Sequence, residues 1–286
     1  MGQSHTPREA AAAKAVVRLS HRLRLDRAYP NPLPLPTRRR IAFQIAPHVV
    51  ARAISNEGNA LTYMRQELDV ARYLLKNGAP VVGPSAELPE CPHIEGGFVF
   101  TFWEFVKDLN AAEDNAEHVA LAADALRRVH EGLNGFRSEW SLPKFSVPIN
   151  NCHDLLMQAA LTGLHERDRS FLVSTFDHLR ASADSLSMDM RPIHGDAHLG
   201  NVFITADGAR WNDLEDVCCG PREWDVSWFY KKNDLAVFEP LNRELVSTLH
   251  YMRKLCTVVW SYQSNDLERH KAAECILAYL KQSRLF

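Results

Sequence analysis

Residues 194–213 read HGDAHLGNVFITADGARWND, and this stretch decides how the rest of the chain is interpreted. Asp196 and Asn201 stand five residues apart, and an apolar run follows Asn201 directly. Asp207-Gly208 favours a tight turn, so the chain is expected to return as a hairpin that ends at Asp213. Such a hairpin brings Asn201 and Asp213 side by side at one end, and three oxygen-bearing side chains are therefore expected to converge.

This set of side chains suits phosphoryl transfer, a reaction that asks a protein mainly for positioning and for neutralisation of charge. The attacking hydroxyl group needs a carboxylate to accept its proton, which Asp196 would supply. Magnesium prefers hard oxygen ligands and takes few of them from a protein, so Asn201 and Asp213 are a sufficient pair. The sequence therefore predicts a magnesium-dependent phosphotransferase whose catalytic centre lies in residues 194–201.

The same region resembles the aminoglycoside phosphotransferase and choline kinase family, a branch of the protein-kinase-like fold. The segments that carry the resemblance are His194-Gly195-Asp196 with Asn201, Trp211-Asn212-Asp213-Leu214-Glu215-Asp216, and Gly220-Pro221-Arg222-Glu223-Trp224-Asp225. The resemblance implies ATP as the phosphoryl donor and Asp196 as the catalytic base. It also implies Asn201 and Asp213 as magnesium ligands, and Asp225 as a buried aspartate that braces the catalytic loop.

The fold implied by this resemblance is α+β and bilobal, protein-kinase-like, with a small β-rich N-lobe and a larger helical C-lobe. Residues 1–106 are expected to form the nucleotide-binding N-lobe, with an N-terminal helix, and residues 107–286 the C-lobe. The C-lobe would carry the catalytic loop, the metal site and the substrate-binding helices. Local apolar patterns predict helices at 10–23, 61–77, 114–133, 151–163, 167–185 and beyond 226, strands at 41–45, 49–54 and 97–106, and an irregular proline-rich stretch at 29–36.

The N-terminal third contains candidate nucleotide-binding residues. A kinase-like small lobe needs a cation on a strand to meet the phosphates, and a helical glutamate to hold that cation. Arg52 lies on a predicted strand, and Glu67 follows fifteen residues later on the next predicted helix. Arginine replaces the family's usual lysine, and it places the charge differently because its guanidinium is a planar fork. Trp103, Glu104 and Val106 belong to the predicted hinge, whose backbone would meet the adenine.

The chain departs from the family pattern at the phosphate loop. No glycine occurs between Gly2 and Gly58. A glycine-rich cradle, in which backbone N–H groups approach the phosphates closely, therefore cannot be assigned. The first hairpin is expected to cover the nucleotide differently or hardly at all.

Two features favour a small-molecule substrate over a protein. Gly195 stands where protein kinases carry an arginine that reads a phosphorylated activation loop. Asp225 follows Asp213 by only twelve positions, which leaves no room for a peptide platform. The acceptor is expected to be a small hydroxyl compound, similar to an aminoglycoside, choline or an amino alcohol. Asp234, Glu239 and Glu244 are candidates for attracting a cationic substrate, although solvated helix charges are the favoured interpretation.

Two alternatives stay open at this point. His194, Asp196 and His198 alternate, so on an extended segment they would face one metal ion, as in a metal-dependent hydrolase. In the kinase interpretation the two histidines support the catalytic loop instead. The second alternative is a non-catalytic, regulatory relative that binds nucleotide, which the glycine-free loop favours slightly.

Composition narrows the remaining classes. The chain has 286 residues and a formal net charge of −2, so it shows no nucleic-acid footprint. Its six cysteines form no C-x-x-C pair, which favours a reducing cytoplasm. No apolar run reaches the length of a membrane span, and the N-terminus lacks an apolar signal core. A monomer or homodimer without nucleic-acid or membrane partners is expected.

Overall fold

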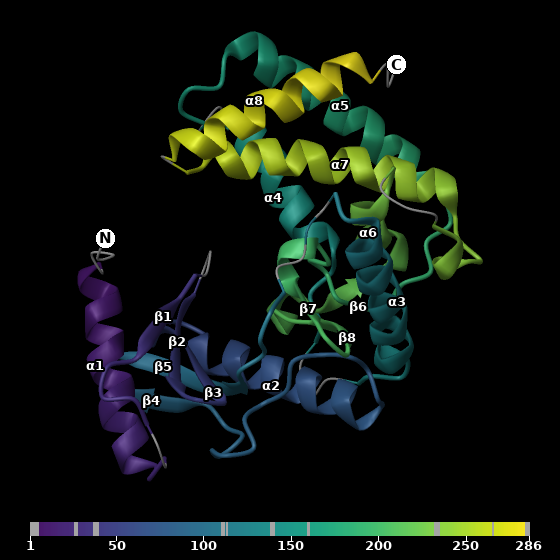
Figure 1. Ribbon diagram of the computed structural model, residues 1–286. Helices are drawn as coiled ribbons and strands as arrows, with labels where there is room; N and C mark the ends of the chain where they lie inside the picture. Colours follow the sequence, from purple (N-terminus) through teal and green to yellow (C-terminus); the bar gives the residue numbers. More distant parts are fainter. Residues whose placement is uncertain are drawn as a thin grey trace. The chain divides into compact units, whose positions relative to one another are not determined.

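The computed structural model describes residues 6–25, 28–36, 40–109, 112, 114–137, 141–158, 161–231, 235–264 and 266–283. The described residues form two compact units, whose elements are labelled in Figure 1. Unit 1 comprises those of 1–140 together with 199–216, and unit 2 those of 141–198 together with 217–286. The predicted lobe boundary between residues 106 and 107 stays a prediction.

Unit 1 is built on a five-stranded antiparallel sheet with the strand order β1-β2-β3-β5-β4. The strands are β1 (Leu33–Leu35), β2 (Ile41–Ala46), β3 (Val49–Ser55), β4 (His93–Glu95) and β5 (Phe98–Glu104). The predicted hairpin of β2 and β3 is present, and Pro47-His48 forms its tight turn. Neither turn residue is glycine, so this turn offers no glycine-rich cradle.

Alternation along β5 decides which side chains meet which helix. Phe98, Phe100 and Phe102 pack with the apolar stripe of α1 (Pro7–Arg22) on one face of the sheet. Figure 1 shows α1 lying against that sheet. Val99 packs against Met64 of α2 (Ala60–Lys76) on the other face. Arg52, the cation predicted to meet the nucleotide phosphates, is directed to this second face.

The remaining elements of unit 1 are one helix, one hairpin and two short 3₁₀ turns. They are α3 (Ala116–Leu133), β7 (Val202–Thr205), β8 (Gly208–Trp211) and the 3₁₀ turns Leu199–Asn201 and Leu214–Asp216. The predicted hairpin is present, and the Trp211 indole N–H donates to the Ala122 carbonyl of α3 at 3.2 Å. The segment before Asp213 is thereby fixed to a long helix.

Unit 2 is mainly helical. Its helices are α4 (Ser146–Met157), α5 (Glu166–Asp184), α6 (Arg222–Val226), α7 (Arg243–Tyr262) and α8 (Leu267–Gln282), and its strands are β6 (Arg191–Ile193) and β9 (Cys218–Gly220). Two 3₁₀ turns cover Ser227–Phe229 and Leu235–Phe238. Buried residues of α4, α5, α7 and α8 form one apolar core. β6 and β9 pair antiparallel, and the loop that carries Asp196 follows β6.

Three sequence expectations were wrong in detail. The stretch 29–36 is not wholly irregular, because β1 forms at the edge of the sheet, where a proline without an N–H is tolerated. Helix α3 begins at Ala116, later than the predicted 114, because its N-cap is Asn115, whose side chain accepts from the backbone N–H groups of Glu117 and His118. Helix α4 begins at Ser146, earlier than the predicted 151, since Pro148 is compatible with a first helical turn.

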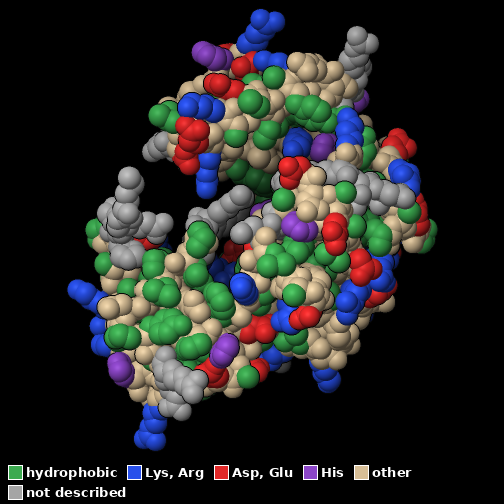
Figure 2. Space-filling model, in the orientation of Figure 1, with side chains coloured by type: hydrophobic (Ala, Val, Ile, Leu, Met, Phe, Trp, Pro, Cys, Tyr) green, Lys and Arg blue, Asp and Glu red, His purple; other side chains and the backbone are tan. Residues whose placement is uncertain are grey.

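The surface and the helices agree with the charge and hydropathy of the sequence. On the face that Figure 2 shows, basic and acidic side chains are interspersed, without one large patch of a single sign. None of the helices in the described part of the chain is both long enough and apolar enough to cross a membrane.

Candidate active site

The loop before Asp196 is fixed by one buried carboxylate. Asp225, which is fully buried on α6, accepts from the backbone N–H of His194 at 2.8 Å and from that of Gly195 at 2.9 Å. The Trp224 indole donates to the Gly195 carbonyl at 2.7 Å. Gly195 has a φ of 88°, a left-handed conformation that any side chain would strain. Backbone hydrogen bonds and the conformation of Gly195 therefore fix the backbone directly before Asp196.

Asp196 is an ionised carboxylate among cationic groups. Its Oδ2 lies 3.4 Å from His198 Nε2, and its Oδ1 lies 3.7 Å from Arg253 Nη1. Burial alone would raise the pKa of Asp196, but the hydrogen bond and charge of His198 outweigh it. The charges of Arg253 and His194 act in the same direction, so the pKa is held well below its usual range. The side chain is 24 % exposed, so the carboxylate can still reach a ligand.

Arg253 is a functional candidate that no sequence motif indicated. It lies on α7, its side chain is only 3 % exposed, and its guanidinium stacks 3.7 Å from the Trp224 ring centroid. It donates to the Trp224 carbonyl and to the Ser227 hydroxyl. Burial lowers the pKa of Arg253 to about 10, although the Asp196 and Asp225 carboxylates oppose this. The only available signal was an arginine in an otherwise apolar helix pattern.

His194 and His198 occupy different surroundings. His194 is fully buried beside the brace from Asp225, whereas the His198 ring lies edge-on to Trp228 with centroids 5.2 Å apart. Among the residues that the structure describes, no three His, Cys, Asp or Glu side chains are arranged to hold one metal ion. His194, Asp196 and His198 thus do not form the three-residue metal site of the hydrolase alternative.

Asn201 and Asp213 stand at the same end of the β7–β8 hairpin in unit 1. Val202 pairs with Trp211 in the register, and the Asn212 N–H donates to the Asn201 carbonyl at 2.8 Å. Asn201 is buried, and the Asp213 side chain is 25 % exposed. The ribbon therefore holds the two predicted ligands beside one another, as the turn chemistry indicated.

This donor set fits a magnesium ion. Asp213 Oδ1 accepts from Arg52 at 3.1 Å, and within the described residues its second oxygen has no protein partner. An open carboxylate oxygen and a neighbouring amide are hard ligands of the kind that Mg²⁺ prefers, with water filling its other positions. Asp213 also has a φ of 61°, rare for a residue with a side chain, so its backbone has to be held in place.

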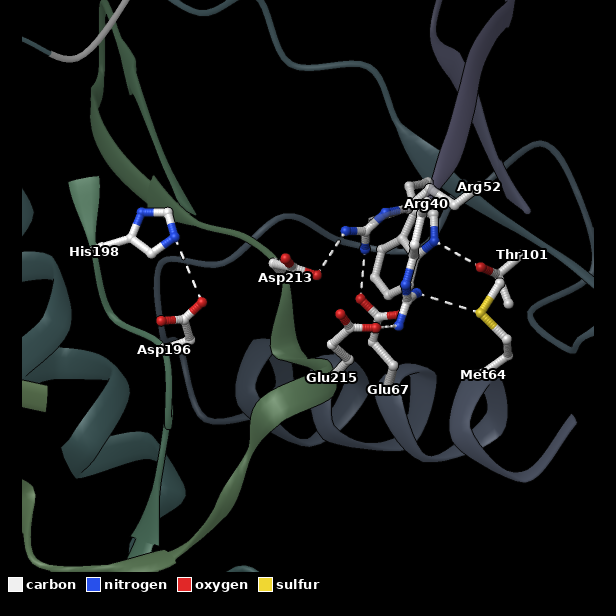
Figure 3. Close-up of polar contacts among 10 residues, drawn as sticks. Arg40, Arg52, Met64, Glu67, Thr101, Asp196, His198, Asp213 and Glu215 are labelled. Atoms are coloured by element: carbon white, nitrogen blue, oxygen red, sulfur yellow. Dashed lines mark hydrogen bonds and ion pairs between the residues drawn. The ribbon is translucent and has the colours of Figure 1, made fainter. Parts of the chain in front are cut away.

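The predicted pair of Arg52 and Glu67 is formed. Arg52 stands opposite Thr101 in the β3–β5 register, on the sheet face covered by α2. Its Nη1 donates to Glu67, which belongs to the buried stripe of α2. Burial would raise the pKa of Glu67, but the charges of Arg52 and Arg40 lower it overall. Figure 3 shows both guanidiniums directed at this carboxylate.

Arg40 and Glu215 are further members that the sequence interpretation missed. Arg40 Nη1 donates to Glu67 at 2.5 Å, and its Nη2 donates to Glu215. No sequence motif indicated Arg40, and Glu215 appeared only within a segment that carries the family resemblance. Their pairing joins residues 175 positions apart, which local patterns cannot show.

The predicted hinge residues are placed along and just after β5. The Trp103 indole donates to Thr101 at 2.9 Å, and the Arg52 guanidinium lies 5.3 Å from the Trp103 ring centroid. Glu104 accepts from the Gly83 N–H at 2.8 Å and donates its own N–H to the Gly83 carbonyl. Val106 follows the strand, and its N–H has no partner among the described residues.

The acidic residues considered for substrate attraction do not form a site. Glu239 pairs with Arg243 at 2.7 Å on the surface, and Glu244 is exposed in the first turn of α7. Asp234 lies outside the described residues. Both side chains are solvated, as the favoured interpretation expected, but only Glu244 lies on a helix, and Glu239 precedes α7.

Comparisons with known proteins place the chain in a family. Residues 8–252 match the family model described as the phosphotransferase enzyme family. No curated protein matches the sequence significantly. Among solved structures, the chain is similar to the GDP complex of an aminoglycoside 2'-phosphotransferase-IIIa, with 14 % identity, a TM-score of 0.68, and coverage of 93 % of this chain and 97 % of that one.

Two further structures share the fold. An amicoumacin kinase in complex with AMP-PNP, Ca²⁺ and Ami is 13 % identical with a TM-score of 0.68, covering 98 % of this chain and 97 % of that one. A choline kinase from Streptococcus pneumoniae is 14 % identical with a TM-score of 0.64, covering 92 % and 99 %. The predicted protein-kinase-like fold and the predicted enzyme class, a small-molecule kinase, are both confirmed. The chain belongs to the phosphotransferase enzyme family.

Proposed function

We propose that the protein transfers the γ-phosphoryl group of ATP, with magnesium, to a hydroxyl group of a small molecule. The observation that carries this proposal is the fixed, ionised Asp196 at the end of a loop braced by Asp225. A carboxylate in this state is ready to accept a hydroxyl proton during phosphoryl transfer. Its low basicity suits a reaction in which orienting the nucleophile matters more than fully removing its proton.

Each residue of the site then has one task. Asp196 orients the acceptor hydroxyl and takes its proton, and Asp225 with Gly195 keeps the loop in place. Asn201 and Asp213 would hold the metal ion, which supplies neutralisation of the phosphate charges when bound. Arg52 would turn its Nη2 from Asp213 to a phosphate oxygen while Nη1 stays on Glu67.

The adenine would meet the backbone just after β5. The N–H groups of Glu104 and Phe105 already donate to the carbonyls of Gly83 and His48. The free N–H of Val106 is therefore the hinge donor that supports base recognition. The similar solved structures include complexes with GDP and with AMP-PNP, so ATP and GTP are both to be compared as donors.

The acceptor is proposed to be a small alcohol of the aminoglycoside, choline or amino-alcohol type. Basic groups also gather on and around α7. Burial lowers the pKa of the His250 imidazole on that helix, and the charges of Lys254, Lys231 and Arg253 act in the same direction. A panel of acceptors should therefore include neutral and anionic alcohols besides cationic ones.

The test is magnesium-dependent nucleotide consumption across that panel. The proposal predicts that at least one acceptor raises ATP consumption well above the acceptor-free rate, and that chelation abolishes the increase. Nucleotide binding without turnover on any acceptor would support the non-catalytic alternative instead. Consumption that persists unchanged without a divalent cation would contradict the assigned roles of Asn201 and Asp213.

A further inference from the structure

Five charged side chains of unit 1 form a ring that includes Arg52, the predicted nucleotide cation. In order around it stand Glu215, Arg40, Glu67, Arg52 and Asp213, and each contacts the next. Asp213 and Glu215 belong to one short segment, so the chain itself closes the ring (Figure 3). We call this set the charged ring.

The charged ring links four parts of unit 1 that are distant in sequence. Arg40 stands directly before β2, Arg52 lies on β3, Glu67 on α2, and the two other acids follow β8. The Glu67 side chain has no exposed surface, whereas Asp213 is the most exposed member. Arg52 Nη2 donates to this partly exposed carboxylate at 3.1 Å, so the link lies at the solvent-accessible end of the charged ring. The ring is therefore best able to open there.

The proposed function requires the ring to open at this link. Asp213 would turn to the metal ion, and Arg52 to a phosphate oxygen. Glu67 would then depend on Arg40 as well as on Arg52 for its charge balance, because a buried carboxylate without a cation is strongly destabilising. Arg40 donates to Glu67 and to Glu215, so its contribution would act through these two carboxylates.

We infer that Arg40 is a positioning residue that holds the metal-binding segment, through Glu215, while Arg52 is engaged by the nucleotide. Asp213 needs such a support because its left-handed backbone is unfavourable for a residue with a side chain. The two residues that follow Asp213 are both held: Leu214 is buried, and Glu215 pairs with Arg40. An arginine suits this position because its fork reaches two carboxylates at once, which a lysine ammonium does less well.

The inference predicts a change in magnesium binding in R40Q whose sign is opposite to the one expected from electrostatic attraction alone. Two arginines and three carboxylates leave the charged ring with a net charge of −1. Replacing Arg40 by glutamine makes that charge −2, and attraction alone would then strengthen magnesium binding. Loss of positioning weakens it instead. The sign of the change in R40Q therefore separates the two explanations.

The experiment titrates magnesium at a fixed ATP concentration and measures the rise in melting temperature. The half-saturating magnesium concentration is then compared between variants. The variants are R40Q, R40K, E215Q and the double variant R40Q/E215Q. Arg22→Gln is the matched control, because Arg22 also pairs with a glutamate in unit 1 but lies on the exposed side of α1. Circular dichroism and the melting temperature without ligands establish that each variant is folded.

The inference, which rests on the proposed function, predicts a rise in the half-saturating magnesium concentration of ~10–100-fold in R40Q, a range typical of groups that support metal ligands. E215Q should show a similar rise, R40K a smaller one, and the double variant no more than the larger single effect. Arg22→Gln should match wild type. If R40Q does not fold, R40K decides the question, because it keeps the net charge of the charged ring and attraction alone then predicts no change in magnesium binding.

Different results would overturn the positioning role of Arg40 and the proposed function. Wild-type protein that responds to magnesium and ATP, together with folded R40Q of equal or stronger magnesium dependence, would overturn the positioning role alone. Wild-type protein with no magnesium-dependent response to ATP would overturn the proposed function and this inference with it.

Discussion

The two regions that carry the predicted site residues are held by different forces. In unit 2, the loop that leads to Asp196 is fixed by hydrogen bonds from backbone N–H groups to the buried Asp225. In unit 1, Asp213 and Arg52 are held by ion pairs of the charged ring. Backbone hydrogen bonds hold one geometry, whereas ion pairs can exchange partners when new charges arrive. Under the proposed function, the catalytic carboxylate would thus be placed in advance, and the ligand-binding side would rearrange.

The largest expected effect separates chemistry from binding. Asp196→Asn removes the proton acceptor but keeps the shape of the side chain, and the brace from Asp225 is untouched. Turnover should fall by ~10²–10⁴-fold, the usual value of a positioned base. Magnesium-dependent ATP binding should stay close to wild type. Steady-state kinetics and thermal shift with ATP measure the two quantities, and normal turnover in the variant would refute the assignment of Asp196.

The next effect tests the brace itself. Asp225→Asn places an amide NH₂ against one of the two backbone N–H groups that the carboxylate now accepts. One buried donor loses its partner, which costs about 1–3 kcal/mol of unfolding free energy. Urea denaturation measures it, with Asp189→Asn as the control because Asp189 is an exposed acid of the same unit. Equal stability of both variants would show that the loop is held by other contacts.

A pH profile tests the electrostatic setting of Asp196. Its pKa is lowered in the folded protein, so its carboxylate adds stability above an unfolded pKa of about 3.9, and that stability is lost as pH falls through the folded pKa. Arg253→Met removes one cation and raises the pKa of Asp196. The acid limb of kcat/KM in this variant should therefore lie at higher pH than in wild type. This shift does not require the variant to unfold. An unmoved limb would mean that Arg253 acts through packing on Trp224 alone.

The smallest expected effect concerns the hinge. Val106→Pro removes one N–H that has no partner in the described structure, and a single net hydrogen bond contributes about 0.5–1.5 kcal/mol. The KM for ATP should rise by no more than ~10-fold while kcat is kept. An unchanged KM would place base recognition elsewhere.

The sequence sufficed for those parts of the site that depend on local chemistry. The hairpin that joins Asn201 to Asp213 follows from Asp207-Gly208 between two apolar runs. This pattern acts over a few residues, so one chain is enough to see it. The pairing of Arg52 with Glu67 was expected instead from the resemblance to a kinase-like small lobe, which places a cation on a strand and a glutamate on the next helix.

Long-range partners were not accessible in the same way. Arg253 reaches Asp196 from α7, and Arg40 reaches Glu215 from before β2, across spans in which no pattern predicts a meeting. Strand β1 was missed for a related reason, since a proline is acceptable there only because β2 lies on one side and no strand on the other. Such features depend on which elements pack together, and only the folded chain shows that.

The most direct test of the central claim follows the γ-phosphoryl group itself. ATP labelled in that group is incubated with magnesium and the acceptor found in the panel, and the labelled acceptor is quantified for wild type and Asp196→Asn. The account predicts label on an acceptor hydroxyl with wild type and almost none with a variant that still binds magnesium and ATP. Equal labelling by both proteins, or label released by wild type only as inorganic phosphate, would contradict it.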